Sequence, residues 1–224
     1  MLPKVRKRKW IEEDVRRARS ISVAVSRIAS GIAADQLREV ELHQVSHGLL
    51  VAIRSEIETL VLDTEGIYVD VNLLVPDPSS DARLLVLNRA NPDRHLNVSY
   101  KKEGMLVWET MQTGRYAYDP DFKSDDEKPY RSILAFPLIF ENKDRTIKAL
   151  GGISIDSSKA HHFDGLEKRL ETKLLPYLTL LKLVLVCRGR YEGNKIKSHS
   201  RRGLSDVLIG GDETLASSIA TGGS

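Results

Sequence analysis

Two apolar runs joined by a short charged segment constrain the fold of this chain more than any other feature of its sequence. They lie in PYRSILAFPLIFENKDRTIKALGGISID, residues 129–156. Each apolar run is typical of a β-strand, and the polar ENKDR between them is typical of a turn. We therefore predict strand, turn and strand here, as in the centre of a sheet.

Helical periodicity marks both sides of this central region. Apolar residues recur every three or four positions over 11–34 and again over 36–62, which predicts amphipathic helices. The sequence leaves open whether residues 11–62 form one long helix or two. In IYVDVNLLV, residues 67–75, apolar and polar residues alternate, which predicts a strand with one polar face. A short helix is predicted between Gly104 and Gly114, and a last helix from Gly165 to about Val186.

The order of these elements is helix, strands, short helix, strands, helix. We therefore predict an α+β fold, with a central antiparallel β-sheet, flanking helices and a long N-terminal helical extension. The last part of the chain, 188–224, is first basic and then rich in Gly and Ser. We expect this tail to be mostly disordered.

The charge of the 224-residue chain is +3, but its distribution is uneven. Residues 1–19 and residues 188–202 each carry a charge of +5, whereas the body between them is mildly acidic. Such basic arms can bind nucleic acid or anionic surfaces, or they can simply keep the protein in solution. The single cysteine, Cys187, excludes an internal disulfide and fits the reducing cytoplasm. We expect no signal peptide and no membrane span.

Three segments in register resemble the GAF domain family, over about residues 38–187. They are EGMLVWETMQTGRYAYDPD (103–121), YRSILAFPLI (130–139) and IKALGGISIDSSKAHHFDGLEKRLETKLLPYL (147–178). The resemblance implies that strands 131–140 and 147–156 are neighbours in the middle of the sheet. Pro137 would then lie at a bulge or beside a gap in the ladder, and Gly151 and Gly152 would make room where a helix or a ligand backs onto the sheet.

The resemblance also implies a ligand site between the sheet and the segment that covers it, here about 98–130. This cover holds six aromatic residues, which suit a flat ligand or simply seal the edge of the core. The acidic loop DPDFKSDDEKP disfavours anionic ligands. The candidate ligand-binding residues are Trp108, Tyr116, Tyr118, Asp119, Tyr130, Arg131 and Ser132.

Residue types that catalysis would need are few. GAF relatives that attach tetrapyrroles need a cysteine in the pocket, and relatives that reduce free methionine sulfoxide need several cysteines. His43 and His47 lie one helical turn apart, but Gln44 stands where a catalytic zinc motif has Glu. We therefore predict that the chain is not an enzyme and holds no metal. The sequence does not identify a cofactor.

These observations divide the chain into a basic N-terminal arm and helix (1–35), a GAF-like sensor domain (36–187) and the tail (188–224). We predict a cytoplasmic regulatory module that binds a small molecule, dimerises through its flanking helices, or does both, to transmit a signal to a protein partner. The alternative is a non-catalytic assembly scaffold with a vestigial pocket. In that case weak, non-specific contact with nucleic acid through the basic arms is expected.

Overall fold

The computed structural model describes residues 15, 18–19, 21–26, 39–61, 66–123, 129–141 and 147–209, with side chains up to Gly189. The described residues between 15 and 26 are helical, and the question of one helix or two over 11–62 falls on residues 27–38, which lie outside the described part. Three further helices follow: α2 (Glu39–Leu60), α3 (Leu106–Thr113) and α4 (Glu167–Ile209). The strands are β1 (Val69–Pro76), β2 (Arg83–Arg89), β3 (Ser99–Lys101), β4 (Ala117–Asp119), β5 (Ser132–Glu141) and β6 (Ile147–Ser157).

The six strands form one antiparallel sheet in the order β3-β2-β1-β6-β5-β4. The α+β fold predicted from the order of the elements is therefore confirmed. β5 and β6 are neighbours near the middle of the sheet, and Pro137 is paired with Gly152 next to a register shift between Leu138 and Ile139. The predicted bulge beside the proline is thus present, and it lies where the ladder is already interrupted.

The two adjacent glycines of β6 make room for neighbours on opposite faces of the sheet. A Cβ atom on Gly152 would lie 2.7 Å from Cγ1 of Val107, on α3. A Cβ atom on Gly151 would lie 2.4 Å from the carbonyl oxygen of Leu74, on β1. Gly152 therefore lets a helix pack closely on the sheet, as predicted, and Gly151 lets a neighbouring strand approach.

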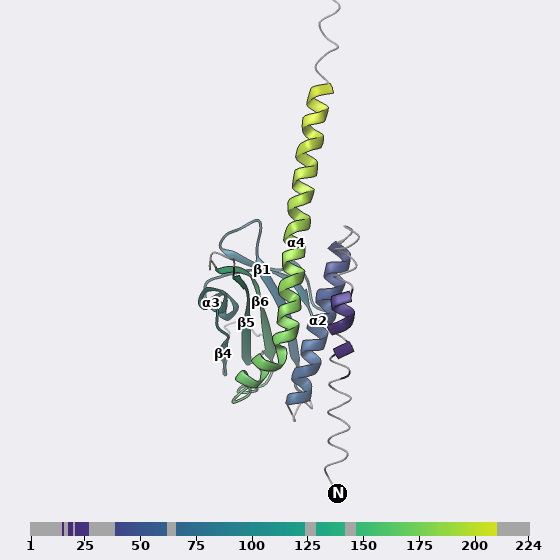
Figure 1. Cartoon of the computed structure of the whole chain (residues 1–224). Coiled ribbons are helices and arrows are strands. Elements are labelled where there is room, and N and C mark those ends of the chain that lie inside the picture. The colour runs from purple at the N-terminus through teal and green to yellow at the C-terminus, as the bar shows by residue number, and fades with distance from the viewer. Residues whose placement is uncertain are drawn as a thin grey trace, which may run out of the picture.

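Helices cover both faces of the sheet (Figure 1). α2 and α4 lie side by side on one face and form the main core with apolar side chains such as Val71 of β1 and Ile153 of β6. α3 covers the other face, where Val107 and Met111 pack with Val86. Full burial of such a side chain is worth about 2 kcal/mol, so both layers stabilise the sheet.

The alternation in β1 determines what lies on each face. The apolar side chains of this strand point toward α2 and α4; they are Val69, Val71 and Leu73. The predicted polar face of the strand is therefore the opposite one. Asp70 and Asn72 lie on the opposite face, yet they are almost completely buried. The polar face of this strand is therefore covered by protein and not by solvent.

α4 is longer than predicted. It passes through Pro176 and ends at Ile209 rather than near Val186, so that it extends well beyond the sheet (Figure 1). Proline is absent after Pro176, and a glycine inside a helix costs only about 1 kcal/mol, so the glycines after Cys187 do not end the helix. Residues 210–224 lie outside the described part. No helix in the described ranges is long and apolar enough to cross a membrane.

Candidate ligand-binding site

A row of polar side chains crosses the buried face of the sheet under α3. The strand register places Arg89 of β2 opposite Asn72 of β1, and Asn72 opposite Ser154 of β6. Asp70 and Asp156 form the next pair on the same two central strands. Directly paired residues have side chains about 5 Å apart, so three strands bring five polar groups together.

All of these groups except Asp70 line a cavity with a volume of about 280 Å³. Its polar side consists of Asn72, Arg89, Arg94, Ser154 and Asp156. The other lining residues are apolar or aromatic for the most part and come from the sheet, from the segment that leads into α3 and from the loop before β5. They are Leu74, Val86, Tyr100, Lys101, Glu103, Gly104, Met105, Leu106, Val107, Phe122, Tyr130 and Ile133.

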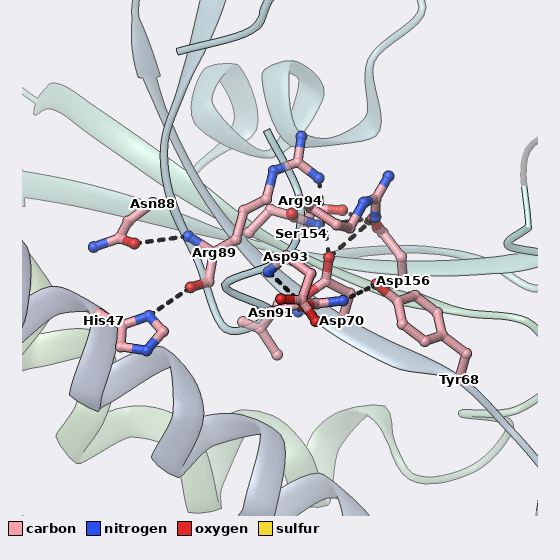
Figure 2. A network of polar contacts seen from close by, with 12 residues as sticks. His47, Tyr68, Asp70, Asn88, Arg89, Asn91, Asp93, Arg94, Ser154 and Asp156 are labelled. Carbon is pink, nitrogen blue, oxygen red and sulfur yellow. Dashed lines mark hydrogen bonds and ion pairs between the residues drawn. The ribbon is translucent and has the colours of Figure 1, made fainter. Parts of the chain in front are cut away.

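Asp70 is the anchor of an ion cluster at one end of the polar row (Figure 2). Its side chain is 0% exposed, and its Oδ2 accepts a hydrogen bond from Nη1 of Arg94 at 3.0 Å. Nη1 of Arg89 lies 3.9 Å from the same oxygen. The other oxygen, Oδ1, accepts from the backbone N–H groups of Val71 and Asn91. A buried carboxylate needs such partners, and Asp70 in turn fixes both guanidinium groups beside the cavity.

Asp156 has a different environment, because its hydrogen-bond donors are neutral. Its Oδ2 accepts from Nδ2 of Asn72 at 2.8 Å, and its Oδ1 accepts from the hydroxyl group of Ser154. Burial raises the pKa of Asp156 to about 6, and the negative charge of Asp70 adds to this rise. Asp156 is therefore a buried carboxylate that has no cation within ion-pair distance among the described side chains.

Two buried polar atoms of the row have no hydrogen-bond partner within the part of the chain that the structure describes. They are Oδ1 of Asn72 and Nε of Arg89, and each of these residues is 5% exposed. An unsatisfied buried polar atom lowers the stability of the folded state by about 1–3 kcal/mol, so such atoms are rare in folded proteins and each one calls for an explanation. Both residues line the cavity, which makes a bound molecule the natural partner.

Aromatic rings form one wall of the cavity. The ring centroids of Phe122 and Tyr130 lie 5.5 Å apart, and both residues line the cavity. Burial raises the pKa of Tyr130 to about 12, with a further contribution from the charge of Asp156. The hydroxyl group of Tyr130 therefore stays protonated at neutral pH.

Of the seven residues that the sequence suggests for ligand binding, Tyr130 lines this cavity. Trp108 is half-buried on α3, with the ammonium group of Lys102 at 4.3 Å from its ring centroid. Tyr116 packs against Phe136, and the hydroxyl group of Tyr118 donates a hydrogen bond of 2.7 Å to Asp164.

The three polar candidates also have partners within the protein. Asp119 accepts a hydrogen bond from the backbone N–H of Asp121. Arg131 is exposed, and its Nη2 lies 2.7 Å from the same Asp121. Ser132 is fully buried and donates to the carbonyl oxygen of Lys159 at 2.8 Å. The structure thus does not gather these three side chains around the cavity.

The histidine pair on α2 has no role at the cavity. Nδ1 of His47 lies 2.8 Å from the carbonyl oxygen of Arg89 (Figure 2), and His43 is exposed beside Asn88. Over the described ranges, no group of three or more His, Cys, Asp or Glu side chains is arranged to hold a metal ion. The contact of His47 instead fixes the end of β2, where Arg89 lies.

Sequence reasoning missed Asn72, Arg89, Arg94, Ser154 and Asp156. The alternation IYVDVNLLV does carry a signal for Asn72, because it places polar residues on one face of a strand. GISID carries the same signal for Ser154 and Asp156. What the sequence lacks is the strand register that puts these two polar faces side by side.

This chain was compared with protein families, curated proteins and solved structures. No protein-family model matches the chain, and the comparison with curated proteins finds no match. Among solved structures, the chain is similar to the GAF domain of phosphoenolpyruvate-protein phosphotransferase from Acinetobacter, with 16% identity and a TM-score of 0.48 over 78% of this chain and 97% of that chain. It is also similar to the GAF domain of a two-component sensor histidine kinase from Bacillus halodurans, with 15% identity and a TM-score of 0.42 over 62% and 95% of the two chains.

A third solved structure is an enzyme, the type II free methionine-R-sulfoxide reductase from Thermoplasma acidophilum. The sequences of the reductase and this chain are 18% identical, and the TM-score is 0.41 over 61% of this chain and 94% of that chain. At these values the similarity says nothing of ligand or reaction. The described part of the chain forms an α+β domain around one six-stranded antiparallel sheet, and membership of the GAF family stays a prediction from its three segments.

Proposed function

We propose that this chain is a regulatory sensor module that binds a small molecule in the cavity between the sheet and α3. The observation that carries the proposal is the pair of unpartnered atoms, Oδ1 of Asn72 and Nε of Arg89, on two residues that line the cavity. The cavity also combines a few polar groups with apolar and aromatic walls, which is the usual composition of a small-molecule site.

A binding role fits the residues of the cavity better than catalysis. The hydroxyl group of Ser154 donates to the carboxylate of Asp156, but no histidine or cysteine lines the cavity, so the commonest nucleophile and base pairs are absent from its described lining. Cys187 is buried on α4, on the opposite face of the sheet. The chain contains a single cysteine, which favours a reducing compartment such as the cytoplasm over an oxidising one.

β6 offers a route for the signal. Ser154 and Asp156 face the cavity, whereas Ile153 and Ile155, between and beside them, pack in the core with α2 and α4. A ligand that shifts β6 therefore changes how the sheet packs against α4. We propose that this change in α4 is what a protein partner, or a second copy of the chain, detects.

The test uses a matched pair of substitutions on α3. Leu106→Trp fills the cavity, and Gln112→Trp adds the same bulk on the exposed side of the helix. Native mass spectrometry of the purified protein should show a retained small molecule in the wild type and in Gln112→Trp, but not in Leu106→Trp. Equal retention in both variants would place the ligand elsewhere and contradict the proposal.

A second candidate function is assembly through the helices, with the cavity playing no part. One observation favours it: several large apolar side chains on the helices are exposed. They are Val23 and Val25 near the N-terminus, Val40 and Val51 on α2, and Leu175 and Leu183 on α4. Such side chains often mark a protein interface.

A further inference from the structure

We propose that the ligand of the cavity is a small zwitterion, such as a free amino acid with an apolar side chain, whose ammonium group pairs with Asp156 and whose carboxylate group binds Arg89. This inference rests on the proposed function of the cavity. It adds the chemical class of the ligand, which follows from the charge, the hydrogen bonding and the shape of the cavity.

The case for an ammonium group begins at Asp156. This carboxylate is 7% exposed and lines the cavity, yet both of its hydrogen-bond donors, Asn72 and Ser154, are neutral. A buried carboxylate is stabilised most by a cation at contact distance. Each of its oxygens can still accept a further hydrogen bond, so a ligand N–H⁺ group has a place to bind.

Asn72 supports the same conclusion. Its Nδ2 donates to the carboxylate of Asp156, which fixes the orientation of the amide because an ionised carboxylate only accepts. The amide oxygen Oδ1 is therefore the atom left for another partner, and it can only accept. It has no partner within the described part of the chain. An ammonium group carries three donors and can serve Asp156 and Asn72 together.

Arg89 is suited to bind a negatively charged group of the ligand. Its Nη1 faces Asp70 at 3.9 Å, but its Nε–H has no acceptor within the described part of the chain. A carboxylate group of the ligand supplies that acceptor and adds a charge-assisted hydrogen bond. Since Arg89 and Asn72 are paired across β1 and β2, the two ends of a compact zwitterion can reach both.

The charge balance of the site excludes the simpler ions. Asp70 and Asp156 carry two negative charges, and Arg89 and Arg94 carry two positive charges, so the polar row together with Arg94 is neutral as a whole. A purely anionic or purely cationic ligand would bring an uncompensated charge into a buried site, which is costly. A zwitterion brings one charge of each sign and leaves the balance unchanged.

The rest of the cavity fits an apolar side chain. Beyond the polar row, the walls include Leu74, Ile133 and Leu106 together with the rings of Phe122 and Tyr130. The volume of about 280 Å³ accommodates one small molecule. A free amino acid with an aliphatic or aromatic side chain therefore combines the polar end and the apolar end that the cavity requires.

The experiment compares three probes that share a phenyl ring and a short chain. L-phenylalanine carries both charges, 2-phenylethylamine lacks the carboxylate, and 3-phenylpropionate lacks the ammonium group. Each is titrated into the full chain, after removal of any retained ligand, and followed by calorimetry up to about 10 mM, since probes of this size bind weakly. Phenylalanine should bind most tightly, with each truncated probe weaker by about thirtyfold or more.

Two variants test the assigned partners. Asp156→Asn keeps the shape of the side chain and removes its charge, so it should weaken phenylalanine by about thirtyfold and leave 3-phenylpropionate no weaker than in the wild type. Asn88→Ser is the control for Asn72→Ser, because Asn88 is buried on the opposite face and bonds to α2. Asn72→Ser should weaken phenylalanine, whereas Asn88→Ser should not.

The outcomes separate this inference from the proposed function. If either truncated probe binds as tightly as phenylalanine and Leu106→Trp blocks it, the cavity binds small molecules but the zwitterion is wrong. If phenylalanine does not bind at all, or binds equally well to Asp156→Asn, the zwitterion is also wrong. The proposed function then still stands or falls by whether Leu106→Trp removes the retained molecule.

Discussion

The residue with the largest expected effect on both stability and binding is Asp156. Its pKa in the folded chain is about 6, against an ordinary value of 3.8, because burial disfavours the charged form. The charged groups around it are Asp70 on β1 and Arg89 and Arg94 at and after the end of β2, and the titratable but neutral phenol of Tyr130 lies before β5. A raised pKa means that the folded state binds this proton more tightly than the unfolded state does.

The sign of the pH effect follows from that difference. The contribution of Asp156 to stability is most favourable below about pH 4, where the group is neutral in both states, and it falls as the pH rises through 6. A shift of this size corresponds to about 3 kcal/mol. We expect Asp156→Asn to be more stable than the wild type at pH 8 by about 2 kcal/mol, and nearly equal at pH 4.

Urea unfolding of both proteins at the two pH values checks this prediction. The difference between the two proteins isolates Asp156 from other titrating groups, such as Asp77, whose pKa is lowered to about 2 by hydrogen bonds from Ser79 and Ser99. If the variant is less stable than the wild type at pH 8, burial of the charged carboxylate of Asp156 does not destabilise the folded state. A more stable variant that loses phenylalanine would show that the site sacrifices stability for binding.

The residue scale is also where prediction from sequence had least success. Aromatic residues in 98–130 suggested the ligand wall, but the sequence cannot say which side of α3 or β4 each ring faces. Tyr116 packs against Phe136 in the main core, whereas Tyr130 lines the cavity. The polar row was missed because Asn72, Arg89 and Ser154 come from three strands, and only long-range pairing brings them together.

At the scale of single elements, two glycines should respond in opposite ways to the same substitution. Gly48 lies on the exposed side of α2, and a Cβ atom there would meet nothing within 4 Å. Gly48→Ala should stabilise the protein by about 1 kcal/mol, because alanine loses less backbone entropy in a helix.

Gly152→Ala should destabilise the protein by about 2 kcal/mol. Its new Cβ atom would lie 2.7 Å from Val107 and 3.1 Å from the carbonyl oxygen of Phe136, and Val107 is buried and β-branched, so it moves with difficulty. Thermal unfolding of the two variants beside the wild type measures both effects. A Gly152→Ala protein as stable as the wild type would mean that α3 does not pack closely on β6.

The elements themselves were largely predictable, because their signals are local. The hairpin 129–156, the helix between Gly104 and Gly114 and the alternating strand β1 follow from periodicity and turn residues within short windows. Gly114 indeed ends α3 with a left-handed conformation, at φ 69°. The end of α4 lies beyond the predicted end near Val186, because the isolated glycines after Cys187 weaken a helix without ending it.

At the scale of the whole molecule, we expect a homodimer that forms through the helices. Leu175 and Leu183 are exposed and lie two turns apart on α4, so they share one face of that helix. Light scattering at tens of micromolar should give twice the chain mass, and the double variant Leu175→Glu, Leu183→Glu should be monomeric.

A matched control for the dimer is the pair Lys148→Glu and Lys159→Glu, which reverses charge at exposed positions outside the helices. This control should remain dimeric. A monomeric wild type, or a Glu variant of the two leucines that stays dimeric, would exclude this interface.

The two basic segments of the sequence give a second whole-molecule prediction. Residues 1–19 and 188–202 each carry +5, so duplex DNA of random sequence should bind weakly, with Kd on the order of 10⁻⁴–10⁻⁶ M and a steep loss with salt. A mobility-shift titration at low and moderate salt measures this binding. Absence of a shift at low salt would contradict the prediction, and a strong preference for one sequence would point to base contacts instead.

The length of α4 gives the molecule a lever. Its buried contacts with the domain extend to Cys187, and the helix then continues to Ile209. The part of α4 beyond Cys187 is about 33 Å long at 1.5 Å per residue. Any tilt of α4 at its packed end would therefore move the far end of the helix most. A change in packing at β6 can in this way become a displacement at the far end of α4 that a binding partner can detect.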